Sequence, residues 1–326
     1  MDDPRTHTFA LVLAQFREWM TAKAFSRYTC RSYHDAVKRF LDWVLEATPV
    51  SSVSDITPWH VHQYQIALHL SSQPTDPPKP YSVGTQCVHL LAVRKFFAFL
   101  VATQRLNFNP TLHLELPRRP RRLPRTILSQ SEARRLVEAI PGTTPLNQRN
   151  RALLEVLYAT GIRLAEVLNL GVHDVDVSHR TVIIREGKGK VDRVLPLTQR
   201  AAEALRVYLG EGRPQLVARH REHPTPNAVF VSSRAKGKLS ALDVDNVVKQ
   251  ASRKAGLNKV PSPHALRHTF ATHLLAGKAD VRQIQALLGH RHLSSTQIYT
   301  QVEVSDLREV IRRCHPREKE ATGGRT

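Results

Sequence analysis

A proline- and arginine-rich segment near the middle of the chain most limits how this sequence can fold. Residues 116–125 read LPRRPRRLPR, and their three prolines favour extended backbone over a helix or a central strand. At 326 residues the chain also exceeds the usual size of one compact domain. We therefore predict a first domain at residues 1–117, a basic linker at 118–126 and a second domain at 127–326.

Apolar residues before this segment recur at the spacing of amphipathic helices. The three stripes consist of Phe9, Leu13, Phe16 and Met20, of Tyr33, Val37, Phe40 and Val44, and of Leu90, Val93, Phe97 and Leu100. Thr57 followed by Pro58 marks the start of a further helix, because proline is favoured at a first helical position. Four prolines between Gln73 and Tyr81 predict an exposed loop without regular structure. The first domain is thus expected to be a small helical bundle.

The sequence after the linker mixes helix and strand patterns. Ser129 and Glu132 have the spacing of a capping box, and an apolar helix is expected over residues 149–160. Residues 181–184 and 191–197 are typical of two strands around a glycine turn at residues 187–189. Further helices are predicted over residues 241–255, 263–276, 281–288 and 304–311. We expect a mainly α chain whose second domain adds a small antiparallel sheet. The last helix is predicted to dock onto a neighbouring protomer, with packing onto its own domain as the alternative.

The charge of the chain points to a polyanionic partner. Lys and Arg outnumber Asp and Glu by 48 to 28, a formal net charge of +20, and nucleic acid is the first candidate. The basic linker carries Arg118, Arg119, Arg121, Arg122 and Arg125. We expect these arginines to lie along a phosphate backbone, although a merely solvated joint is the alternative.

No membrane or export signal is evident from the residue pattern. We find no lipid signal, no basic amphipathic helix and no uninterrupted apolar run near the roughly 18 residues that span a bilayer. The first four residues, MDDP, lack the basic start of a signal peptide, so we expect a cytoplasmic protein. Cys30, Cys87 and Cys314 are far apart and odd in number, which is typical of ordinary thiols.

The helix expected from residue 263 has the features of an anion site. Ser262 can cap it and Pro263 begins it, so His264 and Arg267 lie on one face at its N-terminal end. Free backbone N–H groups, the helix dipole and a guanidinium all favour phosphate there, although a basic surface turn is the alternative. His264 and His268 have the spacing of zinc ligands, but the Glu of an HExxH motif is missing, so zinc is disfavoured.

Other candidate residues are ordinary when taken singly. Arg163 follows a helix interruption and can face outward, but an exposed pair with Glu166 is the simpler interpretation. Lys188 stands between two glycines at the expected hairpin tip, from which it can reach a ligand. His290 directly follows a helix that stops at a glycine, and Tyr299 comes nine residues later. Most such residues are solvated or half-buried groups without a chemical role.

Four motifs in order carry more information than any one of them. They are TGIRLAEV at 160–167, GKGKVDRVLPL at 187–197, HALRHTFATHLL at 264–275 and LLGHRHLSSTQIYTQV at 287–302. Together they resemble the tyrosine recombinase (phage integrase) family, and most closely its Xer-like site-specific recombinases. The resemblance spans nearly the whole chain. It implies a SAM-like core-binding bundle, followed by an α+β catalytic domain of the DNA breaking-rejoining type.

Carried over position by position, the resemblance implies six active-site residues. They are Arg163, Lys188, His264, Arg267, His290 and Tyr299. Tyr299 would attack a DNA phosphate, the two arginines and His290 would stabilise its oxygens, His264 would help to deprotonate the phenol, and Lys188 would protonate the departing oxygen. Because a phosphotyrosine bond preserves the bond energy for rejoining, neither a cofactor nor a metal is implied.

The resemblance also implies partners and a biological setting. Four protomers would pair two double-stranded DNA sites, with or without a second recombinase, and exchange strands through a Holliday junction. The task would be integration or excision of a mobile element, or resolution of DNA multimers, on the nucleoid of a prokaryote. Three rivals are a regulator that lost a catalytic position, a type IB topoisomerase that needs no paired sites, and a zinc hydrolase that chelators would inhibit.

Overall fold

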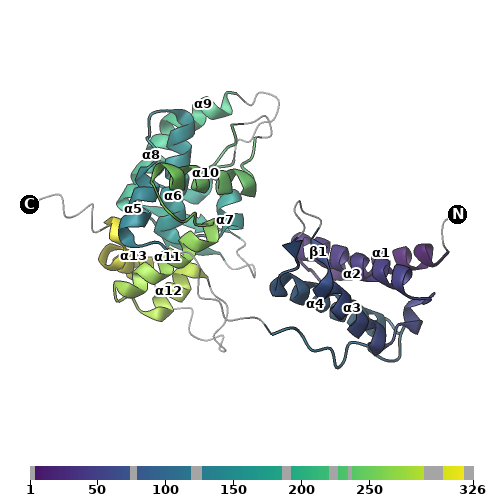
Figure 1. Cartoon of the computed structure of the whole chain (residues 1–326). Coiled ribbons are helices and arrows are strands. Elements are labelled where there is room, and N and C mark those ends of the chain that lie inside the picture. Colours follow the sequence, from purple (N-terminus) through teal and green to yellow (C-terminus); the bar gives the residue numbers. More distant parts are fainter. Residues whose placement is uncertain are drawn as a thin grey trace, which may run out of the picture. The chain divides into compact units, whose positions relative to one another are not determined.

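The computed structural model describes residues 4–73, 79–118, 127–185, 192–219, 227–233, 237–289 and 304–318. The chain forms two compact units, Met1–Arg122 and Leu123–Thr326 (Figure 1). Each unit has its own hydrophobic core. Both units are mainly helical and the second adds a small antiparallel sheet, so the predicted fold class is confirmed. The border between the units falls inside the predicted linker, most of which lies outside the described residues.

The first unit is a bundle of four α-helices. They are α1 (Pro4–Ala22), α2 (Arg27–Ala47), α3 (Pro58–Leu70) and α4 (Val83–Ala102), with a 3-10 turn at Val53–Asp55. Of the three predicted stripes only Tyr33 is not fully buried, and it packs against the core. Phe16 is at the centre, with its ring centroid 5.4 Å from that of Phe96 and 5.6 Å from that of Phe99. Apolar periodicity alone therefore predicted this core.

The proline-rich loop was predicted without regular structure, and this is wrong at its two ends. β1 (Ser72–Gln73) pairs antiparallel with β2 (Lys79–Pro80), and the residues between them lie outside the described ranges. The pairing continues at Tyr81, whose N–H donates to the carbonyl of Ser71, and the buried Tyr81 anchors the returning chain. Proline is tolerated because an edge strand does not need every N–H donor.

α4 is long and apolar enough to cross a membrane by length and hydropathy, the one such helix among the described residues. Half of its most apolar window is nevertheless buried, and the helix packs against α2 in the bundle. Core helices of globular domains pass the same test. Its composition is therefore explained by its place in the core.

The second unit is built from helices around a three-stranded sheet. The helices are α5 (Gln130–Glu138), α6 (Pro145–Thr160), α7 (Leu164–Leu168), α8 (Gln199–Val207), the π-helical η3 (Tyr208–Gly212), α9 (Arg213–Val217), α10 (Ala241–Lys254), α11 (Pro263–Ala276), α12 (Val281–Leu288) and α13 (Val304–Cys314). The capping box of Ser129 and Glu132 is confirmed, as are both ends of α11 and α12. α6 begins earlier than predicted because the Thr144 side chain caps it.

The sheet orders its strands β3 (Val175–Asp176), β4 (Thr181–Ile184) and β5 (Arg193–Pro196), all antiparallel. β4 and β5 confirm the predicted hairpin, although β5 begins two residues later than expected. The predicted glycine turn lies within 186–191, outside the described residues. β3 was not predicted, because two residues are too short for an alternating pattern.

The last helix packs onto its own unit in this structure, which was the alternative to docking onto a neighbouring protomer. The apolar side chains of Leu307, Val310 and Ile311 are buried in the core of their own unit, where α13 packs against α11 and β5. The residues that follow are buried too, and Arg317 donates to the carboxylates of Glu155 and Glu138. Apolar burial thus favours packing onto the same chain.

Candidate active site

Arg163 is placed by a sharp turn between α6 and α7. Gly161 ends α6 in the left-handed region at φ 58°, and its N–H donates to the carbonyl of Leu157. A Cβ atom on Gly161 would lie 2.4 Å from the ring of Phe270, so a larger residue does not fit. The Arg163 N–H then donates to Glu166 Oε2 over 3.0 Å and caps α7. The turn fixes the position from which the Arg163 side chain extends.

Arg267 lies in the second turn of α11 and is only 6% exposed. Its Nη1 donates to the carbonyl of Gly161 over 2.7 Å and its Nη2 to that of Leu288 over 2.6 Å. Burial, together with the charge of Arg163, lowers the pKa of Arg267 to about 10. The guanidinium therefore remains charged at neutral pH.

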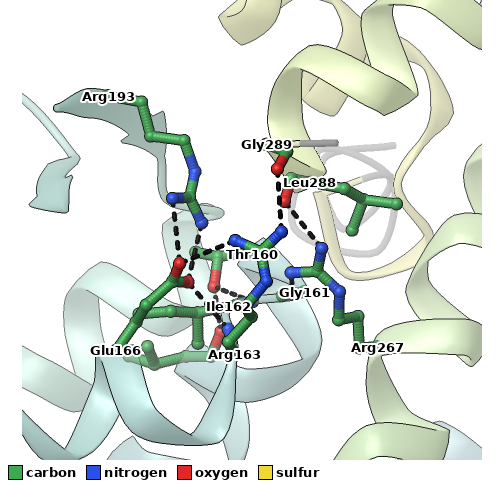
Figure 2. Close-up of polar contacts among 10 residues, drawn as sticks. Thr160, Gly161, Ile162, Arg163, Glu166, Arg193, Arg267, Leu288 and Gly289 are labelled. Atoms are coloured by element: carbon green, nitrogen blue, oxygen red, sulfur yellow. Dashed lines mark hydrogen bonds and ion pairs between the residues drawn. The ribbon is translucent and has the colours of Figure 1, made fainter. Parts of the chain in front are cut away.

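The two arginines meet at the end of α12, as Figure 2 shows. Arg163 Nη2 donates to the carbonyl of Gly289 over 2.7 Å, next to the Leu288 carbonyl that Arg267 binds. Gly289 ends α12 in the left-handed region at φ 63°, as its position in the sequence predicts. Segments more than a hundred residues apart in the chain thus bring two guanidinium groups side by side.

This arrangement leaves both arginines able to bind an anion. A guanidinium has five N–H donors, and the side-chain bonds within the described residues use two on Arg163 and two on Arg267. The contacts hold each planar group in place through carbonyl oxygens and one carboxylate, while the other donors make no side-chain bond within the described ranges. Two adjacent forks suit a phosphate, whose oxygens accept charge-assisted hydrogen bonds.

Sequence reasoning missed the role of Glu166 and did not assign Arg193. The simpler interpretation, an exposed pair of Arg163 and Glu166, is wrong because the Glu166 side chain is only 8% exposed. Arg193 on β5 donates to both of its oxygens, over 3.0 Å and 2.7 Å. Burial alone would raise the pKa of Glu166, but hydrogen bonds from Arg193 and Arg163 outweigh it and lower the pKa. The only sequence signal was an arginine at the start of a largely buried strand.

His264 lies exposed in the first turn of α11, where its Nε2 is 3.1 Å from the Nε2 of His268. Partial burial, and then the charges of His268 and Arg267, lower the pKa of His264. The imidazole is therefore neutral at physiological pH, the form that can accept a proton. In the described parts of the chain, no three His, Cys, Asp or Glu side chains are grouped to hold a metal ion.

Of the remaining predicted site residues, the structure describes only Arg118. Those outside the described residues are Lys188, His290 and Tyr299, together with Arg119, Arg121, Arg122 and Arg125 of the linker. Arg118 is described and exposed. The three cysteines are free and buried, as expected for ordinary thiols. The structure thus brings Arg163 and Arg267 together, and the roles of all the predicted residues stay predictions.

Comparison with known proteins gives one consistent family. The model of the phage integrase family matches residues 126–305, and that of the phage integrase N-terminal SAM-like domain matches residues 13–104. Tyrosine recombinase XerC 2 from Ralstonia nicotianae is 37% identical over 318 residues, which cover 96% of this chain and 88% of that protein.

Solved structures share the fold at lower identity. XerH recombinase bound to its difH substrate has a TM-score of 0.65 at 19% identity, covering 95% of this chain and 83% of that chain. A lambda integrase tetramer bound to a Holliday junction has a TM-score of 0.62 at 17% identity, covering 89% of this chain and 76% of that chain. With a catalytic-family match over more than half its length and a relative of nearly full coverage, the chain belongs to the phage integrase family of tyrosine recombinases.

Proposed function

We propose that this protein is a site-specific DNA recombinase that cleaves and rejoins DNA through a covalent 3′-phosphotyrosine bond at Tyr299. The observation that carries the proposal is the pair of guanidinium groups, Arg163 and Arg267, held on the adjacent carbonyls of Gly289 and Leu288. Gly289 is also the last described residue before the segment of the sequence that contains Tyr299. The pair therefore binds the last two described residues before the part of the sequence that carries the proposed nucleophile.

The arginine pair suits the charge that develops during cleavage. Attack on a phosphodiester increases negative charge on the non-bridging oxygens, and preorganised cations stabilise that state more than the ground state. Backbone carbonyls and Glu166 already fix the two guanidinium groups, so little reorganisation is needed when the phosphate arrives. His290 would add a further hydrogen bond to the same phosphate.

Proton transfers complete the proposed reaction. The phenol of Tyr299, with an ordinary pKa of roughly 10, gives its proton to neutral His264 as its oxygen bonds to phosphorus. The bond from phosphorus to the 5′ oxygen breaks, and Lys188 donates a proton to that oxygen. Rejoining is the reverse reaction, with a 5′ hydroxyl as the attacking group. Each step transfers either a proton or the phosphoryl group, and the six proposed residues include a group for each transfer.

We infer that the partner is double-stranded DNA and that four copies act on two sites. The solved relatives support this, since one is bound to its DNA substrate and another is a tetramer on a Holliday junction. A bacterial relative with nearly full coverage fits action on the nucleoid, in the cytoplasm. Integration or excision of a mobile element and resolution of DNA multimers both use this chemistry, and the sequence of the recovered site distinguishes them.

Covalent trapping tests the proposal. Nicked duplexes drawn from the genomic flanks of the gene should trap wild-type protein as a DNA adduct that survives denaturation. Tyr299→Phe should still bind the duplex but form no adduct, whereas Tyr28→Phe should behave as wild type, because Tyr28 is 82% exposed on α2. An adduct on Tyr299→Phe would overturn the assignment. Relaxation of supercoiled DNA without paired sites would favour the topoisomerase, and loss of cleavage with chelators would favour a metal enzyme.

A further inference from the structure

A third arginine takes part in the cluster without appearing in the predicted set. Arg193 is the first residue of β5, and its side chain is only 14% exposed. Its two terminal nitrogens bind the two oxygens of Glu166 over 3.0 Å and 2.7 Å (Figure 2). Such a bidentate pair fixes the plane of the carboxylate as well as its position.

Glu166 is shared between two arginines, and the sharing is unequal. Arg193 engages both carboxylate oxygens, whereas the Arg163 side chain reaches only Oε1, over 2.8 Å. Two guanidinium groups therefore bind one carboxylate, and with Arg267 nearby the described residues of this cluster carry an excess of positive charge. In a partly buried site an excess cation is costly unless an anion offsets it.

We propose that Arg193 is a positioning residue of the active site, which binds both oxygens of Glu166 and so keeps this carboxylate from neutralising Arg163. Arg163 then stays available to a phosphate while Glu166 still holds it in place. The inference rests on the proposed function, because it assigns to Arg163 a phosphate ligand. Without Arg193, Glu166 would turn fully to Arg163 and compete with the substrate for it.

A second contact places Arg193 beside the arginine pair. Its Nε lies 3.1 Å from the position that a Cβ atom on Gly289 would take, and Gly289 supplies the carbonyl bound by Arg163. This Nε is buried and has no hydrogen-bond partner among the described residues. Arg193 thus contacts the turn that carries the site, and it does more than close the edge of the sheet.

A charge-rescue experiment separates this role from simple structural support. Arg193→Gln should slow single-turnover cleavage of the trapping duplex by about 10- to 100-fold at saturating DNA, with little change in DNA affinity. The double variant Arg193→Gln/Glu166→Gln should recover to within a few-fold of Glu166→Gln alone, because the competing carboxylate is gone while an amide oxygen remains to cap α7.

Two further variants serve as controls. Arg185→Gln also removes an arginine that is ion-paired next to the same hairpin, but its partner is Asp174 and it lies outside the cluster, so cleavage should match wild type. Arg193→Lys keeps the charge without the bidentate fork and should cleave faster than Arg193→Gln. Arg193→Lys also tests the positioning role of Arg193 if Arg193→Gln fails to fold.

The inference is overturned if Arg193→Gln cleaves as fast as wild type, or if the double variant is as slow as Arg193→Gln. Purely structural support predicts the first result when the rate is taken per folded, DNA-bound protein, because the folded fraction would then cleave normally. Failure of the proposed function has a different signature, because wild-type protein itself would then form no adduct with the duplex.

Discussion

The two units of this protein differ in what they bury. Among the described residues of the first unit, the buried polar side chains are Gln86 and Thr111, and the core is otherwise apolar and aromatic. The second unit buries Arg149, Glu155, Arg267 and Arg317 as well as an apolar core. Buried charges seldom improve stability over apolar packing, so their concentration in one unit points to a requirement other than stability.

Two of the buried arginines of the second unit, Arg317 and Arg267, are of different kinds. Arg317 and Glu155 are each 1% exposed and neutralise one another. Arg267 instead donates to two carbonyl oxygens and has no carboxylate bonded to it in the described structure. The first kind closes the fold around α13, whereas the second retains positive charge. Carboxylates therefore neutralise Arg317, whereas Arg267 is held by carbonyl oxygens and keeps its charge for an anionic ligand.

The largest expected effect on folding is in the apolar bundle. Phe16→Ala should lower the free energy of unfolding by about 4 kcal/mol, because it leaves a cavity among packed aromatic rings. All three tryptophans, Trp19, Trp43 and Trp59, lie in this unit, so their fluorescence during urea unfolding of the whole chain reports on it. Phe108→Ala is the matched control, since Phe108 is 55% exposed. Equal losses for the two variants would contradict the assigned core.

The buried ion pair should give a somewhat smaller effect with a different signature. Arg317→Met should cost about 3 kcal/mol, because Glu155 is left buried without its partner. Adding Glu155→Met should recover most of that loss, because no unpaired buried charge then remains. A second truncation in the aromatic core would instead add to the loss. Arg312→Met, on the exposed face of α13, should leave the unfolding midpoint unchanged. Far-UV circular dichroism during urea unfolding measures all three, and a double variant no better than Arg317→Met would refute the pairing.

The smallest effect concerns pH. Cleavage should fall at acid pH as His264 becomes protonated, with a midpoint below the ordinary histidine value because the pKa of His264 is lowered. His268→Asn removes one of the causes, so the pKa of His264 and the acid midpoint should both rise. Single-turnover rates across a pH series measure the shift. An acid midpoint that is unchanged or lower in His268→Asn would argue against His264 as the proton acceptor.

The sequence was most informative where the signal is local. The ends of α11 and α12 follow from Ser262 with Pro263 and from Gly289, because caps and left-handed turns depend on neighbouring residues. The resemblance supplied the positions of Arg163 and Arg267. Neither source indicated that both side chains bind carbonyls at the end of α12, since such contacts leave no periodic pattern.

The shortest of the missed elements share a cause. β3 and α7 span two and five residues, too few for a periodic signal. The packing of α13 onto its own unit and the pairing of Arg193 with Glu166 depend on contacts between distant segments. An amphipathic helix or a lone charged residue has the same sequence pattern whichever partner it finds.

The most direct test of the arginine pair is the single-turnover cleavage rate of Arg267→Lys. Lysine keeps the charge but cannot bind the carbonyls of Gly161 and Leu288 and a phosphate through one planar group. We expect a loss of at least about 100-fold in the rate per folded, DNA-bound protein, with DNA binding close to that of wild type. A rate within a few-fold of wild type would contradict it, because a shared phosphate held by two forked side chains would then be unnecessary.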